Sequence, residues 1–190
     1  LGLQFLSLSG HKLHCPKGVG ALYVNRRCRF NPYLTGGGQE GGRRAGTENV
    51  AYIVGLGKAC EVAVRRLKEE QVEVRALRDA FEVGIMSAVA GVVVNGDRDA
   101  RLPNTSSMSF SGVDAETLLL MLDRKGLCCS AGSACTSGSI HPSHVLKAMG
   151  MSDDRARSSL RFSFSRFNTV AEVERGVTLV AEAVAKIRAG

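Results

Sequence analysis

The segment Ser7-Leu-Ser-Gly-His-Lys12, closely followed by Pro16-Lys-Gly-Val-Gly-Ala-Leu-Tyr-Val24, says most about how this chain folds. Apolar residues bounded by glycine and proline predict one strand over residues 3–8 and another over residues 19–24. The first strand ends in a short polar turn that holds a lysine. A lysine amine can bind a carbonyl cofactor covalently, but most lysines are simply exposed surface residues.

A glycine-rich basic stretch, residues 34–49, follows the second strand. Because glycine resists ordering, we expect no regular element before Thr47. From Thr47 to Asn49 the sequence can start a helix, which is predicted to reach about residue 90 with a break near residues 68–72. Backbone amides and the Thr47 hydroxyl at a helix start can bind an anion, whereas a loop with solvated arginines would account for the same glycines.

The second half of the chain alternates short strands and helices, which is typical of a layered α+β domain. Strands are predicted over residues 91–95, 105–110, 126–130 and 159–164. Helices are predicted after the cap Asp114, from Pro142 to near Gly150, and after the capping box of Thr169 and Glu172. We therefore expect residues 1–68 to be the end of one domain and residues 69–190 to be a smaller domain.

The composition is that of a folded globular protein. Of the 190 residues, 44% are hydrophobic and 23% are charged, and no apolar run is long enough to predict a transmembrane helix. The first residues lack a charged region before the apolar stretch, so they are not predicted to be a signal peptide. The formal charge is +7, of which +5 falls in residues 1–50. Because many of these basic residues lie among glycines, with no aromatic interleaving and no recognition-helix pattern, a small phosphorylated ligand explains them better than nucleic acid does.

The six cysteines suit neither a zinc site nor a disulfide framework, because no two of them form a CxxC pair. We expect a reducing compartment in which most thiols pack in the core, including Cys128 and Cys129 in the strand over residues 126–130. Cys135 differs because it lies within a run of small polar residues, which predicts an exposed loop. It is either a nucleophilic thiol or an incidental surface cysteine. No metal site is predicted, because His141 and His144 lack companions at ligand spacing.

Arg161 interrupts the alternating strand Ser159-Leu-Arg-Phe-Ser163. Burying a charge without a partner is costly, so this guanidinium requires an anion. A substrate carboxylate held in a bidentate pair is one candidate, and an internal salt bridge is the other. The sequence leaves both open at this point.

Taken together, these segments resemble the cysteine desulfurases, which are class V aminotransferases on the pyridoxal 5'-phosphate (PLP) fold-type I scaffold. The resemblance covers nearly the whole chain and implies an α/β fold, with the C-terminal part of the PLP-binding large domain followed by a small α+β domain. Its blocks, in family order, are Ser9–Lys12, Pro16–Val24, Gly36–Glu40, Gly46-Thr47, Leu102–Thr105, Gly132–Ser137, Pro142–Leu146 and Leu160–Ser163.

The resemblance also implies roles for single residues. Lys12 would bind PLP covalently, and Ser9 and His11 would hold its phosphate. Thr47 would reach the phosphate of the cofactor in the partner subunit, which makes the expected form a homodimer. Arg161 would bind the carboxylate of L-cysteine.

Cys135 would take the sulfur, which would turn L-cysteine into alanine and leave a persulfide for an acceptor such as an iron–sulfur scaffold protein. A cytoplasmic enzyme without nucleic-acid or membrane partners is implied. Family members are roughly twice as long, and the part missing here lies upstream, so we expect the chain to be inactive alone. Two alternatives stay open, namely a selenocysteine lyase and a non-catalytic module for acceptor binding or dimerisation.

Overall fold

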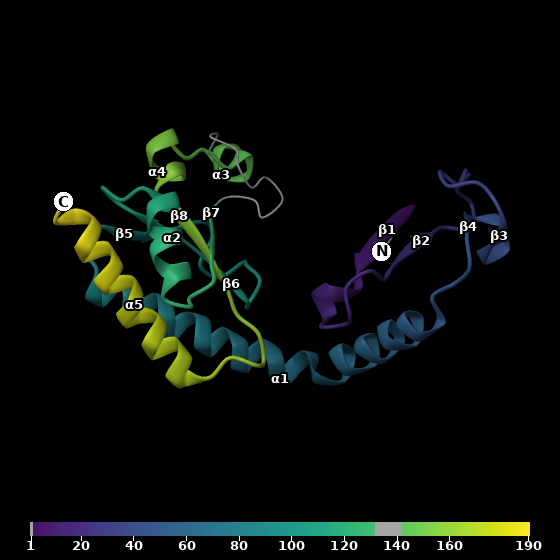
Figure 1. The fold of residues 1–190 in the computed structure, drawn as a ribbon, viewed down its shortest axis with the longest axis horizontal. Coiled ribbons are helices and arrows are strands. Elements are labelled where there is room, and N and C mark those ends of the chain that lie inside the picture. Colours follow the sequence, from purple (N-terminus) through teal and green to yellow (C-terminus); the bar gives the residue numbers. More distant parts are fainter. Residues whose placement is uncertain (1, 132–141) are drawn as a thin grey trace. The chain divides into compact units, whose positions relative to one another are not determined.

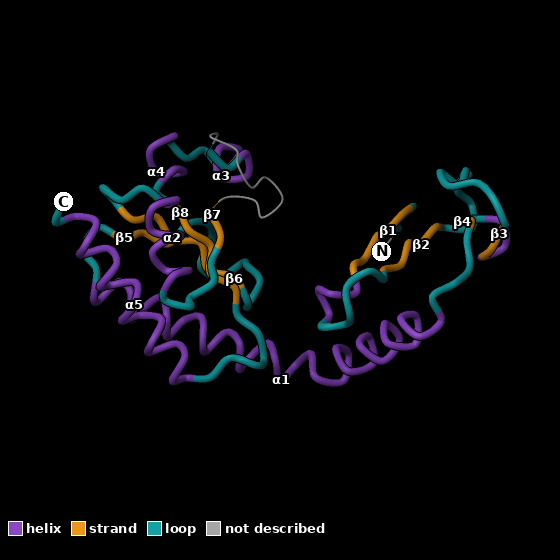
Figure 2. The backbone as a smooth tube through the Cα atoms, viewed as in Figure 1, coloured by secondary structure: helices purple, strands orange, loops and turns teal. Residues whose placement is uncertain are grey.

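The structure, a computed structural model, describes residues 2–131 and 142–190. The predictions for Cys135 and His141 lie outside these residues. The chain divides into two compact units, Leu1–Leu67 and Lys68–Gly190. Figure 1 shows their elements along the chain, and Figure 2 separates helices from strands.

The first unit begins with an antiparallel strand pair. Strand β1, Phe5–Ser9, pairs with β2, Gly20–Val24, and the short helix η1, Gly10–Leu13, follows β1 directly. Both predicted strands are confirmed, the first with its end shifted to Ser9. Gly20 allows the close pairing, because a Cβ atom there would lie 2.5 Å from the Leu8 carbonyl oxygen.

The glycine-rich stretch does hold regular structure, so the prediction of none was wrong. Strands β3, Gly38–Gln39, and β4, Arg44–Ala45, form a small antiparallel pair around the short helix η2, Glu40–Gly42. Glycines with positive φ inside η2 let the chain reverse within a few residues. The sequence pattern missed this because glycine lowers the propensity for every element equally.

Helix α1, Val50–Ala88, runs without interruption, so the predicted break near residues 68–72 was wrong. The residues on either side of Leu67 include neither glycine nor proline, and a charged run of good helix formers keeps the backbone helical. The predicted start is confirmed, because the Asn49 side chain accepts a hydrogen bond from the Tyr52 amide at 3.3 Å.

The second unit contains a four-stranded antiparallel sheet with the order β5-β6-β8-β7. Its strands are β5, Val92–Val94, β6, Thr105–Phe110, β7, Ser130–Ala131, and β8, Ser159–Ser163. Three predicted strands are confirmed, but of residues 126–130 only Ser130 is in a strand. Gly126 has a positive φ and makes a turn there, so Cys128 is exposed rather than packed in a strand.

Two longer helices of this unit start where their caps predict. The Asp114 carboxylate accepts the Thr117 amide, and Thr169 and Glu172 form a reciprocal capping box. Of the two short helices, the one that begins at His144 follows Ser143 and not Pro142, and the one that begins at Asp153 was not predicted from the sequence. These helices are α2, Ala115–Arg124, α5, Val170–Arg188, α3, His144–Ala148, and α4, Asp153–Arg157.

The core of the second unit lies between one face of the sheet and the helices α1, α2 and α5 (Figure 1). Met108 on β6 and Leu160 on β8 point into it, and each is almost completely buried. Alternation then places Ser107 and Arg161, one residue away, on the opposite face. No helix in the described residues combines the length and apolar character that crossing a bilayer requires.

Candidate functional site

The turn after β1 brings two of the predicted residues together. The Ser9 hydroxyl and the His11 ring lie within hydrogen-bonding distance, 2.9 Å from Oγ to Nδ1. Lys12, one residue further along η1, is exposed. A hydroxyl, an imidazole and a primary amine, all on exposed residues, therefore share one short segment around the buried Gly10.

Backbone hydrogen bonds hold this turn in place. The Gly10 amide donates to the Val19 carbonyl at 2.9 Å, and the Cys15 amide donates to the Gly10 carbonyl at 3.1 Å. A Cβ atom at Gly10 would lie 2.8 Å from that Val19 oxygen, so glycine is needed for the close approach. Cys15 is buried beneath the turn. The turn is thus fixed by its backbone and not by contacts of the Lys12 amine.

Thr47 follows the β3–β4 pair and is exposed. Within the described chain, its hydroxyl makes no hydrogen bond to the turn of Ser9–Lys12. Gly46, with a positive φ, directs the chain from β4 toward the start of α1. The structure therefore leaves the Thr47 side chain available without bringing it to the lysine.

Arg161 lies at the centre of a row that crosses three strands of the second unit. Its position on β8 is directly opposite Ser107 on β6 and opposite Ser130 on β7. The Arg161 Nε atom is buried and has no hydrogen-bond partner in the described part of the chain. The internal salt bridge that the sequence left open is not found among the described residues.

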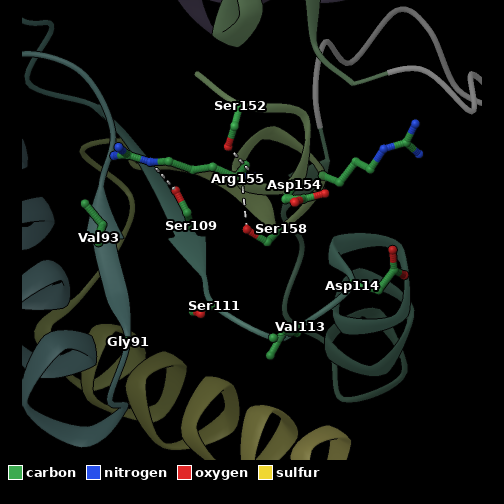
Figure 3. A pocket seen from close by; sticks show the side chains of 12 residues that line it. Gly91, Val93, Ser109, Ser111, Val113, Asp114, Ser152, Asp154, Arg155 and Ser158 are labelled. Atoms are coloured by element: carbon green, nitrogen blue, oxygen red, sulfur yellow. Dashed lines mark hydrogen bonds between the residues drawn. The ribbon is translucent and has the colours of Figure 1, made fainter. Parts of the chain in front are cut away.

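A polar network that the sequence analysis missed lies beside this row. Buried Asn95, which follows β5, donates to the Ser107 and Ser159 hydroxyls, both at 3.1 Å. Its oxygen accepts from the Ser109 hydroxyl at 2.6 Å and from the Arg155 guanidinium at 2.9 and 3.1 Å. Figure 3 shows Arg155 reaching from α4 to Ser109. The only sequence signal for this network was the repeated serine on alternate residues of β6.

A cavity of about 490 Å³ opens next to Arg155 and Ser109. Hydroxyls, carboxylates and guanidinium groups all line it, so no single ligand charge is favoured (Figure 3). None of the described residues with a predicted site role contributes to its wall.

An ion pair and a partly buried thiol of the second unit have surroundings that shift their pKa values. Arg101 bonds both carboxylate oxygens of Glu82, at 2.7 and 2.8 Å. Burial alone raises the pKa of Glu82, but hydrogen bonds from Arg101 and the nearby positive charges outweigh it, so the pKa is lowered. Burial raises the pKa of the Cys129 thiol to about 11, which keeps it protonated at neutral pH.

Known proteins resemble this chain in both sequence and fold. Residues 1–175 match the aminotransferase class-V family. The chain belongs to this family. A cysteine desulfurase of Gluconacetobacter diazotrophicus and the cysteine desulfurase NifS of Azotobacter vinelandii are each 50% identical to the chain over 186 residues. These matches cover 98% of the chain and 46% of each relative.

Solved structures agree with the sequence matches. A NifS-like protein superposes with a TM-score of 0.87 at 34% identity. The match covers 97% of the chain and 47% of the NifS-like protein. A NifS-like protein of Rickettsia africae gives 0.83 at 33% identity, covering 100% and 48%. The class-V chain thus spans about half the length of its relatives and matches their C-terminal half. The expected fold, the C-terminal part of a fold-type I enzyme, is confirmed.

Class-V enzymes of this type use PLP, as the resemblance implied. PLP presents an aldehyde and a phosphate, so its site needs an amine and anion-binding donors. The turn of Ser9–Lys12 supplies an exposed amine beside a hydroxyl and an imidazole, without an acidic side chain in the same segment. This donor set fits the cofactor.

Proposed function

We propose that this chain is the C-terminal half of a PLP-dependent cysteine desulfurase, which converts L-cysteine to alanine and passes the sulfur to an acceptor. The observation that carries the proposal is the 50% identity to cysteine desulfurases over 98% of the chain. The donor set at the turn after β1 and the unpaired Arg161 Nε support it. In this proposal the first unit is the end of the PLP-binding large domain, and the second unit is the small domain.

In this proposal Lys12 holds the cofactor aldehyde, and Ser9 and His11 hold its phosphate. When bound, PLP acts as an electron sink for the negative charge that forms at the substrate α-carbon. The Lys12 amine, once freed from the cofactor by the substrate, is placed to accept and return the α-proton. The backbone bonds of Gly10 support this role, because they fix the turn without using the lysine side chain.

Arg161 binds the substrate carboxylate. Its buried, unpartnered Nε is one half of the pair of parallel N–H donors that a carboxylate accepts. A charged donor without an anion is costly in a buried position. Substrate binding would supply that anion, which gives a physical reason for the Arg161 Nε to have no partner in the described part of the chain.

Cys135, outside the described residues, accepts the sulfur. Its thiolate attacks the substrate sulfur, the carbon–sulfur bond breaks, and the substrate carbon takes up a proton on the way to alanine. L-cysteine and a thiol thus give alanine and a persulfide, so the step needs no external oxidant. An acceptor protein for iron–sulfur or thio-cofactor assembly would then receive the sulfane sulfur. A cytoplasmic homodimer, in which Thr47 reaches the partner's cofactor phosphate, is the expected working form.

The apolar surface of the first unit supports the proposal that this unit packs against further polypeptide, such as the N-terminal half of a relative. Phe5, Leu6, Leu22 and Tyr23 of the β1–β2 pair are each between 45% and 53% exposed. They lie on both faces of the pair, and a lone two-stranded sheet is marginally stable in water. We therefore expect no activity from the chain alone.

The test is reconstitution. The chain is mixed with PLP and the N-terminal half of the Gluconacetobacter diazotrophicus cysteine desulfurase, and alanine formation from L-cysteine is measured. The expected result is a PLP absorbance band and alanine production that needs both halves. Lys12→Ala should abolish the band, whereas Cys135→Ser should keep the band and abolish alanine formation. Cys128→Ser is the matched control, because it removes an exposed thiol without a proposed role and should leave both readouts unchanged.

The alternatives give different results in the same experiment. A selenocysteine lyase would release alanine from selenocysteine and not from cysteine. A non-catalytic module would bind the N-terminal half without producing alanine from either substrate. Alanine formation that survives Cys135→Ser would contradict the proposed sulfur transfer.

A further inference from the structure

Ser107 occupies a special position next to Arg161. The two residues are directly opposite each other in the β6–β8 pair, so their side chains leave the same face of the sheet. On that face Cβ atoms of opposed residues lie about 5 Å apart. Ser107 is only partly buried, whereas its neighbours Ser106 and Met108 on the other face are fully buried.

Asn95 fixes the orientation of the Ser107 hydroxyl. The Asn95 oxygen accepts hydrogen bonds from Arg155 and Ser109, which are both donors there. Reversing the amide would place its NH₂ group against the Arg155 cation, so only one orientation is favourable. The Asn95 nitrogen must therefore donate to Ser107, and Ser107 must accept.

The hydroxyl proton of Ser107 is therefore left without an acceptor in the described part of the chain. A serine hydroxyl has one donor and two acceptor sites, and Asn95 uses an acceptor site. Within the described residues, the Ser107 hydroxyl donates to no group. The free Ser107 proton and the free Arg161 Nε proton thus come from neighbouring positions on one face.

We propose that Ser107 is a second ligand of the substrate carboxylate, donating its hydroxyl proton to the anion that Arg161 binds, while Asn95 acts as the positioning residue that keeps this proton free. The inference rests on the carboxylate-binding role of Arg161 proposed above. It adds a specificity element, because two donors from adjacent strands select a planar anion over a neutral or cationic end group. The ligand class that these two donors select is therefore an ionised carboxylate.

The test reads the ligand directly and needs neither the cofactor nor the missing half. The 190-residue chain is labelled with ¹⁵N, and the Arg161 Nε–H resonance, identified by its loss in Arg161→Lys, is followed during titration with L-alanine. We expect a saturable shift that ethylammonium chloride, which lacks the carboxylate, does not produce. Ser107→Ala should raise the dissociation constant about tenfold, the effect of losing one hydrogen bond to a charged group.

Three further variants separate positioning from general damage. Ser107→Thr keeps the hydroxyl and should keep the affinity. Asn95→Asp replaces the donor with an acceptor that takes up the Ser107 proton, so it should weaken binding although Ser107 is unchanged. Thr105→Ser is the matched control on the same face of β6, opposite Ser163, and should bind like the unaltered chain.

Each negative result of this titration would contradict a different claim. Equal dissociation constants for the unaltered chain and Ser107→Ala would overturn the role of Ser107 and leave that of Arg161 standing. No saturable shift in the unaltered chain would overturn both roles. Alanine production in the reconstituted enzyme is a separate measurement, so its absence would count against the proposed activity and not against the Ser107 ligand.

Discussion

Arg101 and Glu82 form the most buried bidentate ion pair among the described residues, with side chains 15% and 5% exposed. Removing one partner of such a pair leaves an uncompensated charge, which costs about 3 kcal/mol or more. We expect Arg101→Ala to lower the free energy of unfolding by about that amount at neutral pH, measured by urea unfolding followed by circular dichroism. Lys58→Ala is the control, because its pair with Glu61 is exposed and should contribute little.

The pH dependence of the unfolding free energy is a second test of the Arg101–Glu82 pair. The pKa of Glu82 is lowered from its ordinary value of 4.5, so its stabilisation is present above that pH and is lost as the pH falls through the folded-state pKa. In Arg101→Ala, burial should raise the pKa of Glu82 because the opposing effect of Arg101 is gone. Protonation of Glu82 should then stabilise the fold. Below about pH 4.5 the two chains should therefore converge in stability. A constant difference across this range would contradict the assignment.

At the scale of elements, the capping box predicts how α5 is stabilised. The Thr169 hydroxyl accepts the Glu172 amide, and the Glu172 carboxylate accepts the Thr169 amide. Thr169→Ala should cost about 1 kcal/mol of unfolding free energy. Thr178→Ala is the matched control, since this exposed threonine bonds only the Glu174 carbonyl within the helix and alanine has the higher helix propensity. Equal losses in the two variants would show that the cap does not contribute specifically.

The elements also show what the sequence could predict and what it could not. Caps and alternating strands depend on residues within a few positions, and α2, α5, β6 and β8 were placed correctly for that reason. The break expected in α1 was wrong, because good helix formers without glycine or proline continue through residues 68–72. Asn95 escaped notice because its partners, such as Ser159 and Arg155, lie about 60 residues away, and only the folded sheet brings them together.

At the scale of the whole chain, its two units differ in how completely they are built. The second unit has a sheet with one face buried under three helices, and its core includes fully buried Ile85, Leu118 and Val180. The first unit relies on a strand pair with exposed apolar side chains on both faces. Lys12 belongs to the first unit and Arg161 to the second, so the turn proposed to bind the cofactor lies in the unit with less buried core.

This difference predicts how amide hydrogens exchange in the chain alone. Amides of β6 and β8 should exchange slowly, because opening them requires unfolding the core of the second unit. Amides of β1 and β2 should exchange faster by orders of magnitude, because a lone strand pair opens readily. Hydrogen–deuterium exchange with mass spectrometry resolves the two pairs, and the protection of β6 and β8 serves as the internal control.

Adding the N-terminal half of the Gluconacetobacter diazotrophicus relative should then slow exchange selectively in β1, β2 and the turn of Ser9–Lys12. Covering the exposed face of Leu6 and Tyr23 would stabilise the strand pair and, with it, the turn that holds the lysine. Lys12→Ala should retain this protection, because the strands and not the amine make the contact. Slow exchange of β1 and β2 in the chain alone would mean that the first unit is stable by itself, and the need for the missing half would then have to lie in the chemistry.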